Sequence, residues 1–334
     1  MKDYKTTFLL FLLAVLLITL SSRCSWIYPQ LSSDYANAYM SIGRSMLSGK
    51  QLYTEVFGHK GPLFFFFHEW AAALSSETFF GIYLLEILCC FGFLVFSYKT
   101  MRMFAGHYIC LITTCAVGVL TYSSEFILYG DTVEEFSLPI LLYVLYRSLL
   151  YAKLGKLPKN GESVLIGMGI AAIFWMKFTL LAMCVGALVS LLVLAWRRGQ
   201  MLLLLQCLSW IIAGAGGLTA CVLLYFVAHG NESGLYQSYF YYNLFENSDA
   251  GVLAKLWCFY LVPLKWACWA LLVGAVLLVR VPRDVKLVVA MCWGAQLLIF
   301  VLFKIHLHNL LPVFVFAPLM IHFVCGIRHD NPKL

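Results

Sequence analysis

Residues that can do chemistry lie in three polar stretches between long apolar runs. The stretches are YPQLSSDYANAYMSIGRSMLSGKQLYTEVFGHKGP at 28–62, SSEFILYGDTVEEFSLP at 123–139 and NESGLYQSYFYYNLFENSD at 231–249. Their carboxylates suit the deprotonation of a hydroxyl or the binding of sugar hydroxyls. Their cations suit a phosphate group, and their aromatic rings suit a flat ring or a long apolar chain. A functional site is therefore expected among these stretches.

The first stretch predicts a helix that begins at an acid. Asp34 follows two serines that can also cap a helix, and apolar residues recur after it at helical spacing until Gly49. Asp34 then lies at the positive end of a helix that rests on the membrane surface. The plain alternative is that Asp34 only caps this helix. The apolar run 63–74 that follows the HKGP corner predicts a second helix, which is too short to span a bilayer.

Each of the other candidate residues also has a plain structural alternative. Lys177 interrupts a long apolar run, where a lysine can also extend to the lipid headgroups. Glu134 and Glu135 begin an apolar run, where acids also favour the start of a helix. The tyrosines of the third stretch are also typical of an interfacial belt, and a metal site at His306 and His308 has weak support. The candidates are Asp34, His59, Lys60, Asp131, Glu134, Glu135, Lys177, Tyr241, Tyr242, Asn243 and His308.

The composition indicates a membrane protein. The chain of 334 residues is 62% hydrophobic and 12% charged, whereas about a quarter of the residues in a soluble domain are charged. Its apolar runs are continuous and long enough to cross a bilayer as helices. The formal net charge of +7 therefore concerns membrane topology and does not indicate nucleic-acid binding. The twelve cysteines fall mostly in apolar runs without metal-ligand spacing, which indicates packing rather than a disulfide framework.

The sequence predicts an all-α membrane protein with about ten spans. The run 163–196 predicts a two-span hairpin that turns at Lys177. This topology leaves 15 of the 23 basic residues and 4 of the 16 acidic residues on the inner side, as the positive-inside rule requires. The predicted spans are 1–22, 79–98, 107–124, 134–152, 163–176, 178–196, 202–228, 256–279, 285–303 and 309–326.

The same topology describes one domain over residues 1–334, without a soluble C-terminal domain. The first span is expected to remain uncleaved, with a cleaved signal peptide as the alternative. Both termini are then cytoplasmic, and the first outer loop covers residues 23–78. The candidate acids, cations and aromatic residues gather on the outer side, near bilayer depth, where ionisable residues tend to be functional. Their combination predicts the transfer of a sugar from a lipid phosphate.

The first stretch resembles a known family. The runs D-Y-x-N-A-Y, G-R-x-M-L-x-G-x-x-L-Y and F-G-H-K-G-P-L, between Asp34 and Leu63, are similar to the first outer loop of bacterial GT-C glycosyltransferases. These enzymes are relatives of protein O-mannosyltransferases and of the lipid A aminoarabinose transferase. Weaker matches follow in order, and they are GDTVEEFSLP, the Lys177 hairpin, YYN and HLHNLLP. Glu55 replaces the acid that relatives carry there, and many relatives have further spans or a soluble domain.

The resemblance implies a GT-C fold, with surface helices in the first outer loop, and a sugar donor carried on polyprenyl phosphate. It implies that Asp34 is the general base for the acceptor hydroxyl and that the anomeric carbon is inverted. Lys60, Lys177 and His59 are then expected to bind the donor phosphate. The residues expected to bind the sugar or the acceptor are Asp131, Glu134, Glu135, Tyr241, Tyr242, Asn243 and His308. No cofactor is implied, and a divalent metal has no support in the sequence.

The resemblance also places the protein in the bacterial plasma membrane, with the active site on the outer face. The acceptor is a lipid, a glycan or a protein, and a partner subunit is one way to supply its recognition. Two alternatives stay open at this point. One is a transporter or flippase for lipid-linked sugars, and the other is a non-catalytic subunit of a glycosylation complex.

Overall fold

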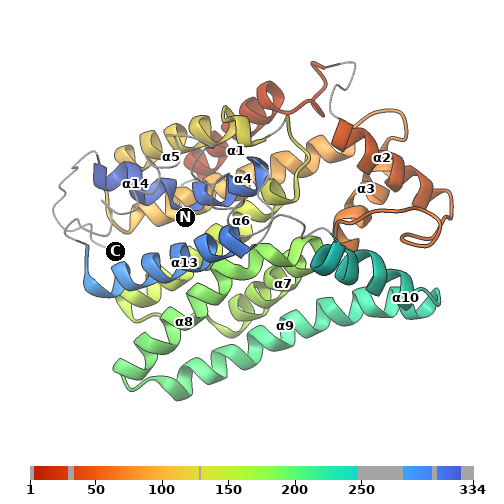
Figure 1. Ribbon diagram of the computed structural model, residues 1–334. Coiled ribbons are helices and arrows are strands. Elements are labelled where there is room, and N and C mark those ends of the chain that lie inside the picture. Colours follow the sequence, from red (N-terminus) through yellow and green to blue (C-terminus); the bar gives the residue numbers. More distant parts are fainter. Residues whose placement is uncertain (1–3, 29–33, 128, 247–280, 303–306, 325–334) are drawn as a thin grey trace.

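The computed structural model describes residues 4–28, 34–127, 129–246, 281–302 and 307–324, and every regular element in them is helical. The predicted all-α class is therefore confirmed. The longer helices lie roughly side by side in one bundle (Figure 1). They are α1 (Tyr4–Ser21), α4 (Phe80–Arg102), α5 (His107–Tyr122), α6 (Val133–Leu154), α7 (Asn160–Lys177), α8 (Ala182–Arg197), α9 (Met201–Ala228), α13 (Arg283–Leu302) and α14 (Ala317–Val324).

The shorter elements connect or cap the long ones. Three of them, α2, α3 and α10, gather beyond one end of the bundle (Figure 1). The shorter elements are α2 (Asp34–Leu47), α3 (Pro62–Leu74), η1 (Glu125–Ile127), η2 (Phe178–Leu181), α10 (Glu232–Leu235), η3 (Tyr236–Glu246) and η4 (Leu307–Phe316). The two helices predicted in the first outer loop are thus confirmed as α2 and α3, and α2 begins at Asp34.

Five helical runs in the described residues are long and apolar enough to cross a membrane. They are α1, α4, α6, the run from α7 through α8, and α9. Helix α5 is apolar but shorter. These runs fit a membrane protein, while the count of ten spans stays a prediction. The predicted span 256–279 lies outside the described residues.

The bundle has two ends that differ in their contacts. At the end called the site end, α7 finishes against the first outer loop, where the Gly61 N–H donates to the Met176 carbonyl at 2.9 Å. At the opposite end, called the basic end, α6 and α8 finish together. There the Arg198 guanidinium donates to the Tyr151 carbonyl at 2.5 Å and pairs with Asp284 at 2.6 Å. Other basic residues at this end are Lys99, Arg102, Lys153 and Arg197.

The chain turns back at Lys177. Lys177 has an extended backbone (φ −163°, ψ 98°), and the short turn η2 follows it. Helix α7 ends at the site end and α8 ends at the basic end, so the two helices run in opposite directions. The hairpin predicted at Lys177 is therefore present, and its turn lies at the site end.

Helices α2 and α3 pack closely at one glycine. A Cβ at Gly43 of α2 would lie 2.5 Å from the His68 carbonyl carbon of α3, so only glycine allows this approach. Tyr39 is buried on the same face of α2, and its ring packs edge-on against Phe64 at a centroid distance of 4.9 Å. The two helices therefore form one unit that carries the first outer loop.

A second glycine lets this unit dock on the end of α7. Gly61 precedes Pro62, the first residue of α3. Proline fits the first turn of a helix because backbone N–H groups there have no partner within the helix, and proline has no N–H. A Cβ at Gly61 would overlap the Trp175 carbonyl oxygen. The HKGP corner of the sequence is thus the point where the first outer loop meets the Lys177 hairpin.

We predict that Gly61→Ala destabilises the protein by about 1–3 kcal/mol, because the added methyl group forces the loop away from α7. The midpoint of thermal unfolding in detergent is the measurement. Gly216→Ala in α9 is the matched control, because a Cβ there meets no atom within 4 Å. A Gly61→Ala protein that unfolds at the wild-type temperature would show that the loop does not dock in this way.

Candidate functional site

Three charged side chains meet at the site end. Lys177 Nζ lies 2.5 Å from Glu134 Oε1, and the two side chains are 20% and 1% exposed. Lys60 is half-buried, and the charges of both Lys177 and Glu134 act on its ammonium group. These residues form the Lys60 cluster (Lys60, Glu134 and Lys177). The fold thus brings together three predicted site residues from distant parts of the sequence.

The backbone around Lys60 is held from several sides. The Tyr53 hydroxyl donates to the Lys60 carbonyl at 2.7 Å. The Asn243 amide donates to the His59 carbonyl at 2.6 Å. On the other side, Gly61 is bonded to α7. Because the backbone is fixed at three successive residues, the Lys60 ammonium emerges from a defined position.

The environment of Lys60 changes its protonation. Burial lowers the pKa of Lys60 to about 8, the nearby Lys177 also lowers it, and Glu134 raises it. At pH 7 the amine is therefore still mostly protonated. The Lys60 cluster then holds two cations and one carboxylate, which leaves one positive charge to attract an anion such as a phosphate.

Aromatic residues of η3 pack on the Lys177 turn. The Tyr239 hydroxyl donates to the Phe174 carbonyl and accepts the Phe178 N–H at 3.2 Å. The Tyr239 ring also packs edge-on against Phe178, with centroids 5.6 Å apart. Element η3 is a π-helix. This form is rare in proteins overall, but where it occurs it often lies at a functional site. These contacts fix the two ends of the Lys177 backbone turn.

The three predicted residues of η3 face in different directions. The Tyr242 ring lies 6.0 Å from the His59 ring, and Asn243 is bonded to the His59 carbonyl. Tyr241 is 43% exposed and pairs with Phe245 at 5.2 Å. The fold therefore places Tyr242 and Asn243 beside the HKGP corner and leaves Tyr241 toward the surface.

Asp34 lies at the exposed start of α2. On the buried face of the same helix, Tyr39 approaches the site. Its burial, followed by the charges of Asp131 and Glu134, raises the pKa of the Tyr39 hydroxyl. Helix α2 therefore connects the exposed Asp34 to Tyr39 at the edge of the Lys60 cluster.

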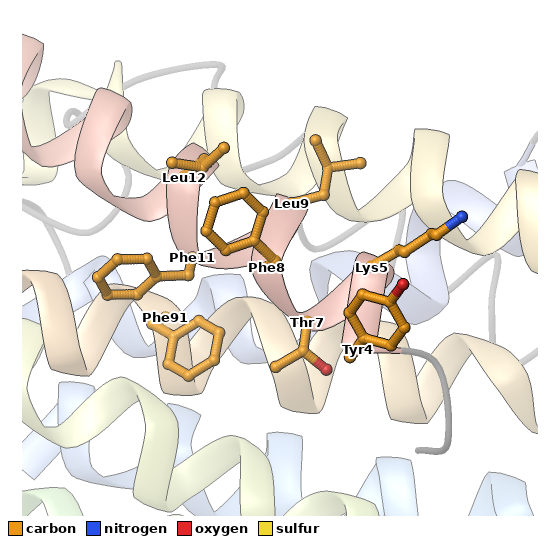
Figure 2. Close-up of a pocket in the computed structure, with 8 residues that line it drawn as sticks. All are labelled: Tyr4, Lys5, Thr7, Phe8, Leu9, Phe11, Leu12 and Phe91. Carbon is orange, nitrogen blue, oxygen red and sulfur yellow. The ribbon is translucent and has the colours of Figure 1, made fainter.

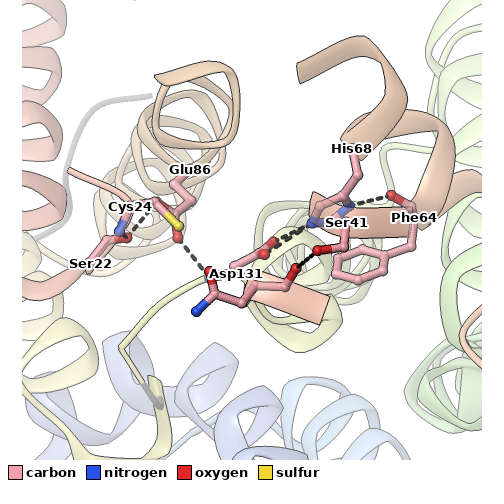
Figure 3. A network of polar contacts seen from close by, with 8 residues as sticks. Ser22, Cys24, Ser41, Phe64, His68, Glu86 and Asp131 are labelled. Carbon is pink, nitrogen blue, oxygen red and sulfur yellow. Dashed lines mark hydrogen bonds and ion pairs between the residues drawn. The ribbon is translucent and has the colours of Figure 1, made fainter. Parts of the chain in front are cut away.

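A second polar network lies at the site end (Figure 3). His68 Nε2 lies 2.9 Å from Asp131 Oδ2, and His68 Nδ1 lies 2.8 Å from the Phe64 carbonyl. The Asp131 N–H donates to Glu86 Oε1 at 2.7 Å, and the Ser22 hydroxyl donates to Glu86 Oε2 at 2.7 Å. All members are buried. We call this set the His68 network (Ser22, His68, Glu86 and Asp131).

The predicted acids of the second stretch lie in different surroundings. Glu134 pairs with Lys177, whereas Asp131 pairs with His68. Glu135 is fully buried, and neither of its carboxylate oxygens has a hydrogen-bond partner among the described residues. Successive side chains on an α-helix point about 100° apart, so Glu134 and Glu135 meet different neighbours.

Two further expectations concern histidine and metal. His308 falls within η4, but its side chain lies outside the described residues. In the part of the chain that the structure describes, no group of three or more His, Cys, Asp or Glu side chains is arranged to hold a metal ion.

An apolar groove of about 1030 Å³ runs beside α1, and its lining side chains come from α1 and from Phe91 of α4 (Figure 2). Phe8, Phe11 and Phe91 line it, together with Lys5. It begins near the start of α1, at the basic end, because the end of α1 reaches Glu86 at the site end through Ser22. Its lining is typical of a surface that faces lipid.

Sequence reasoning did not identify Tyr39, Tyr53 or His68 as members of the site. Tyr53 and Tyr39 belong to the helix-and-turn pattern of the first outer loop, and nothing in that pattern indicates that either residue contacts the site. His68 stands in an apolar helix, where a buried imidazole must find a hydrogen-bond partner. That requirement is a signal, but a single sequence does not identify Asp131 as the partner, 63 residues away.

In comparisons with known proteins, no family model, no curated protein and no solved structure matches the chain. The resemblance to GT-C glycosyltransferases therefore rests on the sequence motifs alone.

We predict that the two neighbours of Lys60 shift its apparent pKa in opposite directions. Glu134→Gln removes the charge that favours the ammonium form and lowers the pKa from about 8. Lys177→Met removes a repelling cation and raises it. The measurement is competitive amine labelling across pH, read by mass spectrometry at Lys60. Equal pKa values in all three proteins would show that the cluster does not form.

Lysine at position 60 also makes stability depend on pH. Its pKa is lower in the folded state, so folding releases a proton between about pH 8 and the ordinary lysine pKa of about 10.5. The free energy of unfolding is expected to rise through this window as pH rises. Lys60→Met should flatten that rise, as measured by chemical unfolding in detergent, while Lys50→Met at an exposed site in the same loop should retain it.

Proposed function

We propose that the protein is a membrane glycosyltransferase of the GT-C type, which moves a sugar from a polyprenyl-phosphate donor to an acceptor hydroxyl. The Lys60 cluster is the observation that carries this proposal. It places two ammonium groups and one carboxylate at one end of an apolar bundle. A lipid phosphate suits such a place, because its chain partitions into hydrocarbon while its charge stays at the surface.

The proposed reaction is a displacement at the anomeric carbon. The acceptor hydroxyl gives its proton to Asp34 as its oxygen bonds to that carbon. The bond from the carbon to the phosphate oxygen breaks, and polyprenyl phosphate leaves with the electron pair. Lys60 and Lys177 stabilise the charge that develops on the leaving phosphate. Attack opposite the leaving group inverts the anomeric centre.

Glu134 then has a supporting role on the donor side. Since it is buried against Lys177, it holds that ammonium in place and offsets part of its charge. His59, Tyr242 and Asn243 border the donor position from η3 and the HKGP corner. Asp131, Glu135, Tyr241 and His308 stay predictions for sugar or acceptor binding.

The distribution of charge supports an outward-facing site. Basic residues are concentrated at the opposite end of the bundle, which by the positive-inside rule faces the cytoplasm. We therefore place the site end on the outer face of a bacterial plasma membrane, with both termini cytoplasmic.

The arrangement of buried charge favours an enzyme over a transporter or flippase. A transport path needs polar residues along several spans. In the described residues, the fully buried ionisable side chains of His, Asp and Glu gather at the site end instead. They are His68, Glu86, Asp131, Glu134 and Glu135.

The proposal predicts that Asp34→Asn lowers sugar transfer by at least about a hundredfold, because removal of a general base typically costs that much. Surface glycans, lipids and proteins are compared by mass spectrometry in cells that lack the protein and in cells that carry each variant. Wild-type protein should restore one sugar-sized mass increment, and Asp34→Asn should not, at equal membrane abundance.

Glu77→Gln is the matched control, since it neutralises an exposed carboxylate of the same loop. It should behave as wild type. Full activity of Asp34→Asn would remove Asp34 from the catalytic role. Glycans, lipids and surface proteins that are identical with and without the protein would contradict the glycosyltransferase itself.

A further inference from the structure

We propose that His68 is an imidazolium that pairs with the Asp131 carboxylate, and that this pair sets the position of Glu134 in the Lys60 cluster. His68 is thus a positioning residue, which acts through Asp131 and Glu134. The inference rests on the geometry of the two networks, and its bearing on sugar transfer rests on the proposed function.

The hydrogen bonds of His68 determine its protonation. Nδ1 lies 2.8 Å from the Phe64 carbonyl, which can only accept, so Nδ1 carries a proton. Nε2 lies 3.0 and 2.9 Å from the two oxygens of Asp131. A bare Nε2 would face those oxygens lone pair to lone pair. A second proton must therefore lie between His68 and Asp131.

The surroundings favour an ion pair over a neutral one. Glu86 is bonded to the Asp131 backbone, and Glu86 and Asp131 both act electrostatically on Glu135. From α2, the ring of Tyr39 packs on His68 at 5.7 Å. Asp131, Glu86 and Glu135 thus share one buried region, where a charged imidazole is stabilised by whichever of these carboxyl groups is ionised.

The pair holds a strained backbone segment. Tyr129, Gly130 and Asp131 all have positive φ, at 72°, 96° and 56°. Two of these are not glycine, and such residues persist in this region only when their surroundings hold them. The Arg23 N–H donates to the Tyr129 carbonyl at 2.8 Å, and the Asp131 N–H donates to Glu86. His68 supplies a further attachment, through the Asp131 side chain.

This segment leads directly into the start of α6. The Thr132 hydroxyl caps the helix by accepting the Glu135 N–H at 3.2 Å. Glu134 lies three residues after Asp131 and only 2.5 Å from Lys177. A shift or rotation of the segment therefore moves Glu134 relative to Lys177 and Lys60. The two polar networks of the site end are joined through these few residues.

The test is His68→Asn, read at Lys60. Asparagine keeps a donor near the Phe64 carbonyl but removes the charge and the contact with Asp131. If Glu134 loses its position, its effect on Lys60 weakens, and the labelling midpoint of Lys60 falls toward that of Glu134→Gln. If His68 acted on Lys60 only through its own positive charge, loss of that charge would raise the labelling midpoint of Lys60 instead. The direction of the change therefore distinguishes a positioning role from a direct electrostatic effect.

His107→Asn is the matched control, because His107 makes a hydrogen bond to Tyr98 at 2.7 Å on α4 and α5, away from the site. Its Lys60 midpoint should equal that of wild type. An unchanged or raised midpoint in His68→Asn would overturn the positioning role.

A second measurement reads the wild-type protein itself and uses a variant only to assign the signal. Ring-¹⁵N-labelled histidine in the wild-type protein should show one imidazole, absent from His68→Gln, with protons on both nitrogens at pH 7.5. A single-proton tautomer at this residue would overturn the ion pair. Neither readout uses sugar transfer, so failure of the glycosyltransferase proposal and failure of this one are distinguishable.

Discussion

The ion pair between Lys177 and Glu134 is the contact on which the site end depends. Glu134 is 1% exposed, and a buried carboxylate without a partner costs several kcal/mol. Lys177 meets that need only if the chain turns back where α7 ends and if α6 begins beside that turn. Gly61 docks on the same turn, which brings Lys60 to the pair. The need to pair the buried Glu134 with Lys177 thus constrains α6, α7 and the first outer loop. The same charged groups leave a net positive charge that can attract an anion.

Much of this arrangement follows from the sequence. Continuous apolar runs predict helices at the positions where the structure has them, and the asymmetry of basic residues predicts the reversal at Lys177. The resemblance to GT-C glycosyltransferases implies that Lys60 and Lys177 act together on a lipid phosphate. In the fold Lys177 acts on the charge of Lys60, while their joint binding of a phosphate stays a prediction. These features depend on hydrophobicity and charge, which local sequence carries.

Other features depend on contacts between distant residues, which local sequence does not carry. Glu134 and Glu135 are neighbours of the same type, yet only the packing of α6 decides which of them faces Lys177. His68 joins Asp131 because α3 packs against α2 and beside the start of α6, and no periodicity contains that information. The left-handed conformation of Tyr129, two residues before Asp131, is likewise imposed by its surroundings rather than by its own preference. The sequence therefore identifies the two lysines as candidates, whereas the His68 network could not be predicted from it.

The central claim is that the Lys60 cluster binds the phosphate of a polyprenyl lipid, and direct binding tests it most simply. Native mass spectrometry of the purified protein would compare polyprenyl phosphate with the uncharged polyprenol. We predict that wild type and Lys50→Met retain polyprenyl phosphate in preference to polyprenol, and that Lys60→Met binds the phosphate about tenfold or more weakly. Equal retention of the two lipids, or full retention of the phosphate by Lys60→Met, would contradict the account.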